Sequence, residues 1–525
     1  MTSPQPTLEV VHQASPVPDP APRRRLSVPR LLLALAGIAA MGAGGMKGVA
    51  IFRADRSLPP PLVAPYVDAT LTPLFPFEDQ AALPAQTVVL GFVVADPTSP
   101  CTPSWGGYHT LDDARTALDI DRRIARFRQR GGDVLVSFGG AANTELAVGC
   151  SDQTSLEGAY RSVIDRYRPA TIDLDLEGTA LADGDALARR ARALKAIQRQ
   201  RKASGTPLGI WLTLPVSPSG LSPEAVHAVD VMLYEGVDLA GVNVMTMNYG
   251  TSRDSSQSLL EASEAALDAT HRQVADLWRR AGVELQGDQV WARIGATPMI
   301  GQNDAAGDHF SLADARALES FAAGNHLGRL SMWSLNRDKA CGGNIDPQHV
   351  SDYCSGVDQK ALDFNAVFAK LPGRPVGTAT ASPAPQAVRR SPSSFDDPAT
   401  SPYPIWREDK SYQKGDEVVW RRNVYEAKWW SQGDQPDAPV AQAWDTPWRL
   451  VGPVLPGDRP KAEPPALPAG TYPDWSDTQA YEKGQRVLRN GHPYEAKWWT
   501  QDDVPGADVA NDWDTPWRAV AGAKT

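Results

Sequence analysis

Eight apolar, β-branched stretches alternate with helical patterns between residues 64 and 371. A strand–helix unit repeated eight times in one domain closes into a barrel more readily than it extends into an open sheet. The sequence therefore predicts an α/β fold, a (β/α)8 barrel, followed by two small all-β modules. The expected strands span 65–71, 87–95, 133–140, 170–177, 208–216, 241–249, 292–301 and 328–336.

The fourth expected strand, "TIDLDLEG", carries Asp173, Asp175 and Glu177 at every second position. Successive side chains of a strand point to opposite faces, so these three carboxyl groups share one face. Shielded like charges repel, and such a cluster holds some of its protons. This arrangement adds nothing to the stability of the fold. A catalytic role for the three carboxyl groups is therefore favoured. The rival interpretations are the solvated face of an edge strand and a set of ligands for a divalent cation.

Further unusual residues stand at expected strand ends, where barrel enzymes build their active sites. A glycine pair at a strand end allows close approach of backbone or ligand. A tryptophan at the barrel mouth offers a flat apolar floor for a sugar ring. No histidine neighbours Ser137 in a triad-like context, so we interpret this serine as a structural residue rather than a nucleophile. The candidates are Ser137, Gly139, Gly140, Met247, Asn248, Tyr249 and Trp333.

The chain has four cysteines, none in a CxxC pair and none beside a histidine cluster, which argues against zinc. Four cysteines allow three pairings. We favour Cys101–Cys150 and Cys341–Cys354, each closing a loop near one barrel end, with free buried thiols as the alternative.

The N-terminus combines a polar tail (1–30) with an apolar stretch in residues 31–52 behind a basic flank. This pattern predicts a signal peptide or an uncleaved membrane anchor, with twin-arginine export as a weaker alternative. The expected location is extracellular (secreted), or anchored in the inner membrane with the enzyme outside the cytoplasm.

Two proline-rich stretches, 372–402 and 452–470, are predicted linkers. They separate two repeats, 403–451 and 471–521, that align without a gap at an offset of 69 residues. Eleven of the 16 tryptophans lie in the last 125 residues, more than such small cores can hide.

The motifs "SFGG", "DLDLEG", "MNYG" and the late "WS" resemble the ordered signatures of family 18 glycoside hydrolases, the chitinases and their relatives. "CTPSWGGY", "TPMIGQND" and "WSLNRD" suggest a bacterial chitinase-like branch, and Trp105 in the first of these is a further candidate for substrate binding. The resemblance covers residues 64–370 and implies substrate-assisted, retaining hydrolysis.

The resemblance implies a role for each member of the site. Glu177 would be the general acid, and Asp175 would hold the acetamido N–H of the substrate and stabilise the oxazolinium cation. Tyr249 would orient the same group, and Asp173 would share a proton with Asp175. Trp333 would form the apolar floor of the subsite that holds the distorted sugar.

Two departures from the family pattern affect the expected pH dependence. Ala170 stands where an acid is usual, and Asn248 stands where Asp is frequent. The loss of a charge beside Glu177 is expected to lower the pKa of that acid somewhat. Neither departure removes the acid, so activity is expected.

The repeats resemble carbohydrate-binding modules of families 5 and 12, through "VYEAKWW" and "WDTPWR" in the first copy and "PYEAKWW" and "WDTPWR" in the second. Aromatic faces stack on pyranose rings. The resemblance implies chitin contacts by Trp429, Trp430, Trp498 and Trp499, with one of each pair possible as core because neighbours in a strand face opposite ways.

The combined prediction is an exported chitinase with two binding modules, monomeric, without metal or cofactor, acting on chitin or a related N-acetylglucosamine polysaccharide. The alternatives are an endo-β-N-acetylglucosaminidase acting on glycans or peptidoglycan, and a catalytically weak chitin-binding protein. The net charge of −10 argues against nucleic acid as the main partner. A membrane is expected as a partner only through the N-terminal anchor.

Overall fold

The computed structural model describes residues 58, 60–79, 87–342, 350–371, 396–438, 440, 443–461, 465–507, 509 and 514–520. The predicted signal or anchor at 31–52, and most of the predicted linker 372–402, lie outside these residues. Among the described residues, no helix combines the length and the apolar character needed to cross a membrane.

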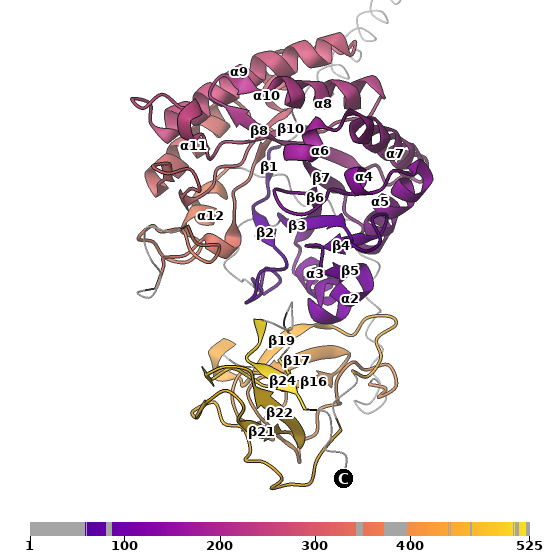
Figure 1. The fold of residues 1–525 in the computed structure, drawn as a ribbon, viewed down its shortest axis with the longest axis vertical. Coiled ribbons are helices and arrows are strands. Elements are labelled where there is room, and N and C mark those ends of the chain that lie inside the picture. The colour runs from indigo at the N-terminus through magenta and orange to yellow at the C-terminus, as the bar shows by residue number, and fades with distance from the viewer. Residues whose placement is uncertain are drawn as a thin grey trace, which may run out of the picture. The chain divides into compact units, whose positions relative to one another are not determined.

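Eight parallel strand positions close into a barrel (Figure 1). The first is shared by β1 (Leu62–Val63), which pairs with the last strand, and β2 (Tyr66–Asp68), which pairs with the second. The predicted (β/α)8 barrel is confirmed. The other strands are β3 (Thr87–Ala95), β6 (Asp133–Gly139), β7 (Thr171–Asp175), β8 (Gly209–Ser217), β10 (Gly241–Met245), β11 (Ile294–Ala296) and β14 (Arg329–Leu330).

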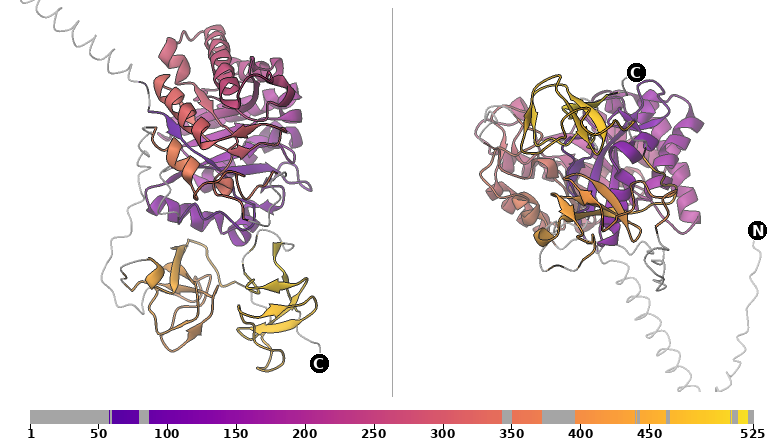
Figure 2. Two further views of the ribbon diagram at one scale, coloured as in Figure 1. Left: turned by 90° about the vertical axis from the view of Figure 1, so that its left-hand side faces the viewer. Right: turned by 90° about the horizontal axis from the view of Figure 1, so that it is seen from below.

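Helices lie outside the strands and cover them from solvent (Figures 1 and 2). Several begin at side-chain caps; Ser258 and Glu261, for example, form a reciprocal capping box at the start of α9. The helices are α2 (Leu111–Ala117), α3 (Ile120–Gln129), α4 (Leu146–Gly149), α5 (Gln153–Tyr167), α6 (Gly178–Ala182), α7 (Gly184–Ala203), α8 (Pro223–Tyr234), α9 (Leu259–Arg280), α10 (Gly287–Trp291), α11 (Leu312–Gly324) and α12 (Asp363–Phe368).

Short elements decorate the loops of the barrel. They are β4 (Pro103–Trp105), β5 (His109–Thr110), β9 (Gly220–Leu221), β12 (Gly301–Gln302), β13 (His309–Phe310) and the 3-10 helices η1 (Gly250–Ser252) and η2 (Leu335–Arg337).

Strand β7 ends at Asp175, two residues earlier than predicted, because α6 begins at Gly178. Glu177 nevertheless keeps an extended backbone, with φ −130° and ψ 160°, as the residue before that helix. The every-second-residue alternation therefore persists past the last ladder hydrogen bond, and Asp175 and Glu177 line the same pocket.

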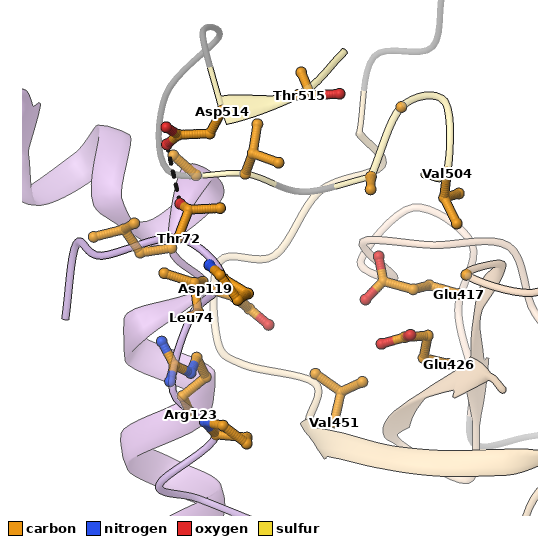
Figure 3. A pocket seen from close by; sticks show the side chains of 18 of the residues that line it. Thr72, Leu74, Asp119, Arg123, Glu417, Glu426, Val451, Val504, Asp514 and Thr515 are labelled. Atoms are coloured by element: carbon orange, nitrogen blue, oxygen red, sulfur yellow. Dashed lines mark hydrogen bonds between the residues drawn. The ribbon is translucent and has the colours of Figure 1, made fainter. Parts of the chain in front are cut away.

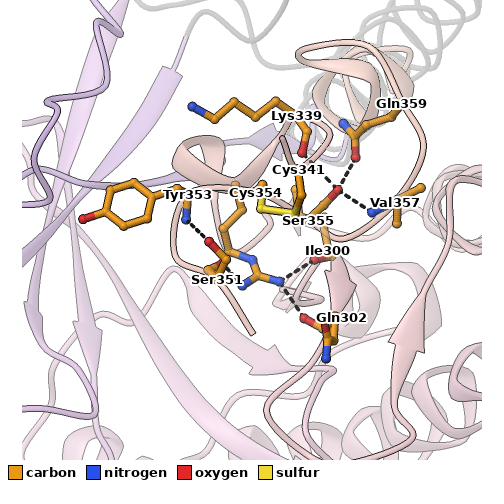
Figure 4. The surroundings of a disulfide bond; sticks show 11 residues. Ile300, Gln302, Lys339, Cys341, Ser351, Tyr353, Cys354, Ser355, Val357 and Gln359 are labelled. Carbon is orange, nitrogen blue, oxygen red and sulfur yellow. Dashed lines mark hydrogen bonds between the residues drawn. A yellow bond between two sulfur atoms is a disulfide. The ribbon is translucent and has the colours of Figure 1, made fainter. Parts of the chain in front are cut away.

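Both predicted disulfides are confirmed: Cys101 pairs with Cys150, and Cys341 pairs with Cys354. The second closes the loop after β14. The buried guanidinium of Arg337 donates to the backbone carbonyl groups of Ser351 in this loop and of Ile300 and Gln302 at β12 (Figure 4). The loop is therefore tied to the segment that leads to Asp304.

The two C-terminal repeats have the same fold, each a two-stranded and a three-stranded antiparallel sheet. Their cores are built by equivalent residues, with Trp406, Tyr412 and Trp448 in the first and Trp475, Tyr481 and Trp517 in the second. The predicted pair of small all-β modules is confirmed. The first has β15 (Ser411–Tyr412), β16 (Glu417–Trp420), β17 (Asn423–Ala427), β18 (Ser431–Gln432), η4 (Ala443–Asp445) and β19 (Trp448–Pro453), and the second has β20 (Ala480–Tyr481), β21 (Arg486–Arg489), β22 (His492–Ala496), β23 (Thr500–Gln501) and β24 (Trp517–Ala519).

Candidate active site

A pocket of about 290 Å³ opens at the C-terminal ends of the barrel strands. Its lining combines three carboxyl groups with apolar and aromatic side chains, a composition typical of small-molecule sites. The lining residues include Tyr66, Phe92, Asp175, Glu177, Thr213, Met245, Met247, Asn248, Met299, Asp304 and Trp333.

Asp173 lies beneath this pocket as the centre of a buried polar cluster. Its carboxylate accepts hydrogen bonds from the hydroxyl groups of Tyr66 (2.8 Å), Ser137 (2.7 Å) and Thr213 (2.7 Å). Arg329 of β14 reaches across the barrel interior and forms an ion pair of 2.5 Å with the same carboxylate. Among the hydrogen bonds of the described residues, none joins Asp173 to Asp175, so the expected proton sharing stays a prediction.

Arg329 was missed by the sequence analysis, although it is fully buried. The signal was a lone arginine inside the apolar run "GRLSMW". Since a buried charge is costly unless it is paired, such an arginine points to a buried acid elsewhere in the chain. It supplies the cation that holds the Asp173 carboxylate in the barrel interior.

Asp175 stands one layer nearer the pocket and has an unpaired atom. Its Oδ1 atom is buried and has no hydrogen-bond partner among the described residues. Burial raises the pKa of this carboxyl group well above its ordinary value, and the charges of Glu177 and Asp173 add to the effect, while Arg329 opposes it. A carboxyl group with a raised pKa and an unpaired oxygen at a pocket can bind a polar group of a ligand.

Glu177 is half-buried at the pocket, and desolvation raises its pKa above that of an ordinary glutamate. A carboxyl group that keeps its proton toward neutral pH is suited to general acid catalysis. Asp175 and Glu177 both line the pocket, whereas the oxygens of Asp173 are occupied by donors from inside the barrel.

The aromatic side of the pocket is formed by Trp333 and Phe92, whose rings are stacked with centroids 5.6 Å apart and an interplanar angle of 22°. Tyr66 packs against both. Trp333 is thus placed where the sequence predicted an apolar floor. Phe92 and Tyr66 were not singled out, because one aromatic residue in a strand is more often core than site.

The segment after β10 differs from the prediction. Met247 and Asn248 line the pocket, but Tyr249 does not: it is buried outside it, with its hydroxyl group 3.4 Å from the Ser263 hydroxyl on α9. β10 ends at Met245, and Asn248 has a left-handed backbone with φ 54°, which turns the chain. The expectation that Tyr249 orients a substrate group is therefore corrected for this structure.

Asn248 instead forms hydrogen bonds to the loop that carries Asp304, an acid that is not among the candidates from the sequence. Its Nδ2 group donates to Asp304 (3.0 Å), its Oδ1 atom accepts from the Ala305 N–H (3.2 Å), and its own N–H donates to Asn303 (3.1 Å). Asp304 also lines the pocket. A carboxyl group from a neighbouring loop is thus held at the pocket by Asn248.

Three other predicted ligand contacts have structural roles here. Trp105 is fully buried and donates to the Tyr167 hydroxyl group (2.9 Å), so the prediction that it binds substrate is wrong. Ser137 is buried and donates a hydrogen bond to Asp173, which agrees with its interpretation as a structural residue. A β-carbon at Gly139 would lie 2.1 Å from the Asp175 carbonyl oxygen, so this glycine is required by the approach of two strands.

Gly140 likewise serves the packing of the pocket wall. Its N–H donates to the Asp175 carbonyl oxygen (3.0 Å), and a β-carbon there would lie 3.0 Å from the Phe92 ring. The glycine pair therefore sets how closely Phe92 and Asp175 approach each other, and its role in ligand contact stays a prediction.

Both tryptophans of each module pair are exposed, at 44% and 61% for Trp429 and Trp430 and 44% and 56% for Trp498 and Trp499. Neither member is core, contrary to the alternative that one of each pair would be buried. Trp444, 71% exposed, was not singled out. In the part of the chain that the structure describes, no cluster of three or more acidic, histidine or cysteine side chains could hold a metal ion.

Residues 474–518 match the family model described as Carbohydrate-binding module family 5/12. The chain is 34% identical over 304 residues to a probable bifunctional chitinase/lysozyme of Escherichia coli, covering 56% of this chain and 33% of the relative. It is 34% identical over 295 residues to endochitinase 11 of Metarhizium anisopliae, covering 54% of this chain and 53% of the relative. It thus spans about a third to a half of the length of these curated relatives.

The catalytic domain of a hyperthermophilic chitinase from Pyrococcus furiosus is similar in structure, with a TM-score of 0.51 and 28% sequence identity. The similarity covers 60% of this chain and 96% of that domain. The chain therefore contains a chitinase-like catalytic domain and one module that matches the carbohydrate-binding family. The first repeat shares the fold of the second but lies outside the matched residues.

Proposed function

We propose that this protein is a glycoside hydrolase that cleaves the β-1,4 linkages of chitin, with Glu177 as the general acid. The observation that carries the proposal is the pair of carboxyl groups with raised pKa, Asp175 and Glu177, at one pocket beside an aromatic floor. The similarity to chitinase catalytic domains supports the same conclusion.

In the proposed reaction, Glu177 protonates the leaving glycosidic oxygen. The acetamido oxygen of the bound sugar attacks its own anomeric carbon, which gives an oxazolinium cation and retains the configuration after attack by water. Asp175, with its unpaired oxygen, accepts a hydrogen bond from the acetamido N–H that strengthens as the cation forms, and the Glu177 carboxylate left by the first proton transfer takes a proton from the attacking water. The ion pair with Arg329 holds Asp173 in place beneath Asp175.

We further propose that both C-terminal repeats bind chitin through their exposed tryptophan pairs. Aromatic faces stack on sugar rings, and four exposed tryptophans in two equivalent pairs would be a liability on a surface with no ligand. A soluble oligosaccharide needs only the barrel pocket, whereas an insoluble polymer also engages the modules.

The primary test is Glu177→Gln, which keeps the shape of the side chain and removes the transferable proton. We expect hydrolysis of chitooligosaccharides to fall by about 10²- to 10⁴-fold with folding and chitin binding unchanged. Glu224→Gln, an exposed change in α8, is the control and should retain full activity. Near-normal turnover of Glu177→Gln would refute the assignment.

Two product analyses define the substrate and the route. NMR of fresh products is expected to show the β-anomer first, and initial release of the α-anomer would rule out the substrate-assisted route. Parallel digestion of crystalline chitin, peptidoglycan and a glycoprotein is expected to release soluble products mainly from chitin. Faster release from either of the other two would favour the alternative substrate.

A further inference from the structure

The two C-terminal modules share a fold but differ at two positions that meet each other. At the offset of 69 residues, Arg489 of the second module stands where the first has Trp420, and Asp416 of the first stands where the second has Gln485. Trp420 keeps its own role within the first module, because its indole N–H donates to Asp437 at 2.7 Å. Equivalent positions of the two modules therefore carry side chains with different contacts.

Arg489 and Asp416 form an ion pair of 2.7 Å between the modules, and their side chains are only 9% and 7% exposed. Asn490 donates to the same Asp416 oxygen at 2.7 Å. Arg489 also donates to the Lys414 carbonyl group across the interface and to the Pro505 carbonyl group of its own module. A buried ion pair with several additional hydrogen bonds indicates a specific contact between the modules rather than an incidental contact between exposed charges.

Neighbouring contacts continue the interface on both sides of the pair. Lys414 forms an ion pair with Asp502 at 2.7 Å. A β-carbon at Gly415 would lie 3.0 Å from a Val504 methyl group, so the turn that carries Asp416 packs directly on the second module.

The segment that joins the modules is also held. Asp458 is buried and forms ion pairs with Arg115 (2.8 Å) and Arg122 (3.1 Å) of the barrel helices α2 and α3. Thr72 of the barrel donates to Asp514 of the second module, and side chains from the barrel and both modules surround one pocket (Figure 3). The described residues from 60 to 520 group as a single compact unit. The predicted linker 452–470 thus includes a residue with specific partners.

We propose that the two modules form one body that carries both exposed tryptophan pairs, joined by an asymmetric interface in which Arg489 of the second copy binds Asp416 of the first. The reciprocal pair would need Gln485 and Trp420, which carry no opposite charges, so the contact closes within one chain and does not propagate to further copies. The inference goes beyond the proposed function, because it concerns how the modules are held and not what they bind.

The test compares the full-length wild type with variants that exchange the interface residues between copies. Asp416→Gln and Arg489→Trp each introduce the residue that the equivalent position of the other module already accommodates, so each module is expected to fold. Hydrogen exchange in peptides covering 413–417 and 488–491 should become about tenfold faster or more in both variants, which corresponds to loss of a local opening free energy. Small-angle X-ray scattering should show a larger radius of gyration.

A charge exchange supplies the decisive comparison. The single variants Asp416→Arg and Arg489→Asp should lose protection, and the double variant should regain most of it, because the pair is restored in reverse. Arg518→Asp, at an exposed ion pair with Glu495 in the same module, is the control and should leave both measurements unchanged. Unchanged exchange and scattering in all interface variants would overturn the proposal. Neither readout involves chitin, so a failure here is distinct from a failure of the proposed function.

Discussion

At the scale of single residues, the proposed general acid Glu177 can donate its proton only while it is protonated, and its desolvated environment extends the pH range in which it is protonated. Desolvation raises the pKa of Glu177, so the protonated acid persists to higher pH than for a solvated glutamate, whose pKa is about 4.3. We expect the rate to fall on the alkaline side, with a midpoint clearly above that value. The pH dependence of kcat/KM on a soluble chitooligosaccharide measures it, and a midpoint at or below about 4.3 would contradict the desolvated site.

Arg329 belongs to the same scale, because one residue neutralises the acid beneath the pocket. Arg329→Met would leave Asp173 buried without its cation, and breaking a buried pair in this way costs about 3–5 kcal/mol of unfolding free energy. Denaturant titration monitors the loss. Arg279→Met, at an exposed pair with Asp276, should cost less than about 1 kcal/mol. Equal stability of the two variants would show that Arg329 does not hold Asp173.

At the scale of elements, the spacing of β6 and β7 sets where Asp175 stands. Gly139 has φ 100°, and a β-carbon there would meet the Asp175 carbonyl oxygen at 2.1 Å, so Gly139→Ala forces the two strands apart. We expect a lower midpoint of thermal unfolding and a kcat that falls more than KM changes, because the acid is displaced.

Gly131→Ala is the matched control for this change. Gly131 also has positive φ, at 85°, but no atom lies within 4 Å of its added β-carbon. Gly131→Ala should lower the unfolding free energy by only about 1 kcal/mol, the conformational cost of a β-carbon at positive φ, and should leave the kinetics unchanged. If both variants lose activity equally, strand approach is not the reason that Gly139 is required.

At the scale of the whole molecule, the proposed function assigns binding of insoluble chitin to the modules and hydrolysis to the barrel, and the two can be tested separately. Replacing Trp429 and Trp430 by Ala, or Trp498 and Trp499, removes one exposed aromatic pair and, under the proposed function, one of two linked binding sites. Each double variant is expected to weaken binding to chitin beads by about 10²-fold, since avidity requires both sites. The kinetics on soluble oligomers should be unchanged. Failure of the wild-type protein to bind chitin through these pairs would mean that the repeats have another ligand.

The sequence by itself determined the barrel, the paired repeats and the strand that carries the acids. These follow from local rules: the alternation of Asp173, Asp175 and Glu177 fixes a shared face, and an apolar stretch followed by a helical pattern fixes a strand–helix unit. The sequence also singled out both tryptophan pairs and favoured the two observed disulfides among three pairings, whereas the exposure of all four tryptophans came from the structure. Each of these features depends on spacing along the chain.

Only the tertiary structure decided which groups meet across the barrel. Arg329 reaches Asp173 from more than 150 residues away, Asn248 recruits Asp304 from the next loop, and a left-handed turn takes Tyr249 out of the pocket. Trp105 became core because Tyr167, on a distant helix, satisfies its indole. The pairing of Asp416 with Arg489 belongs to the same class. Long-range partners are set by chain closure and packing, and no local pattern in the sequence encodes the distance between them.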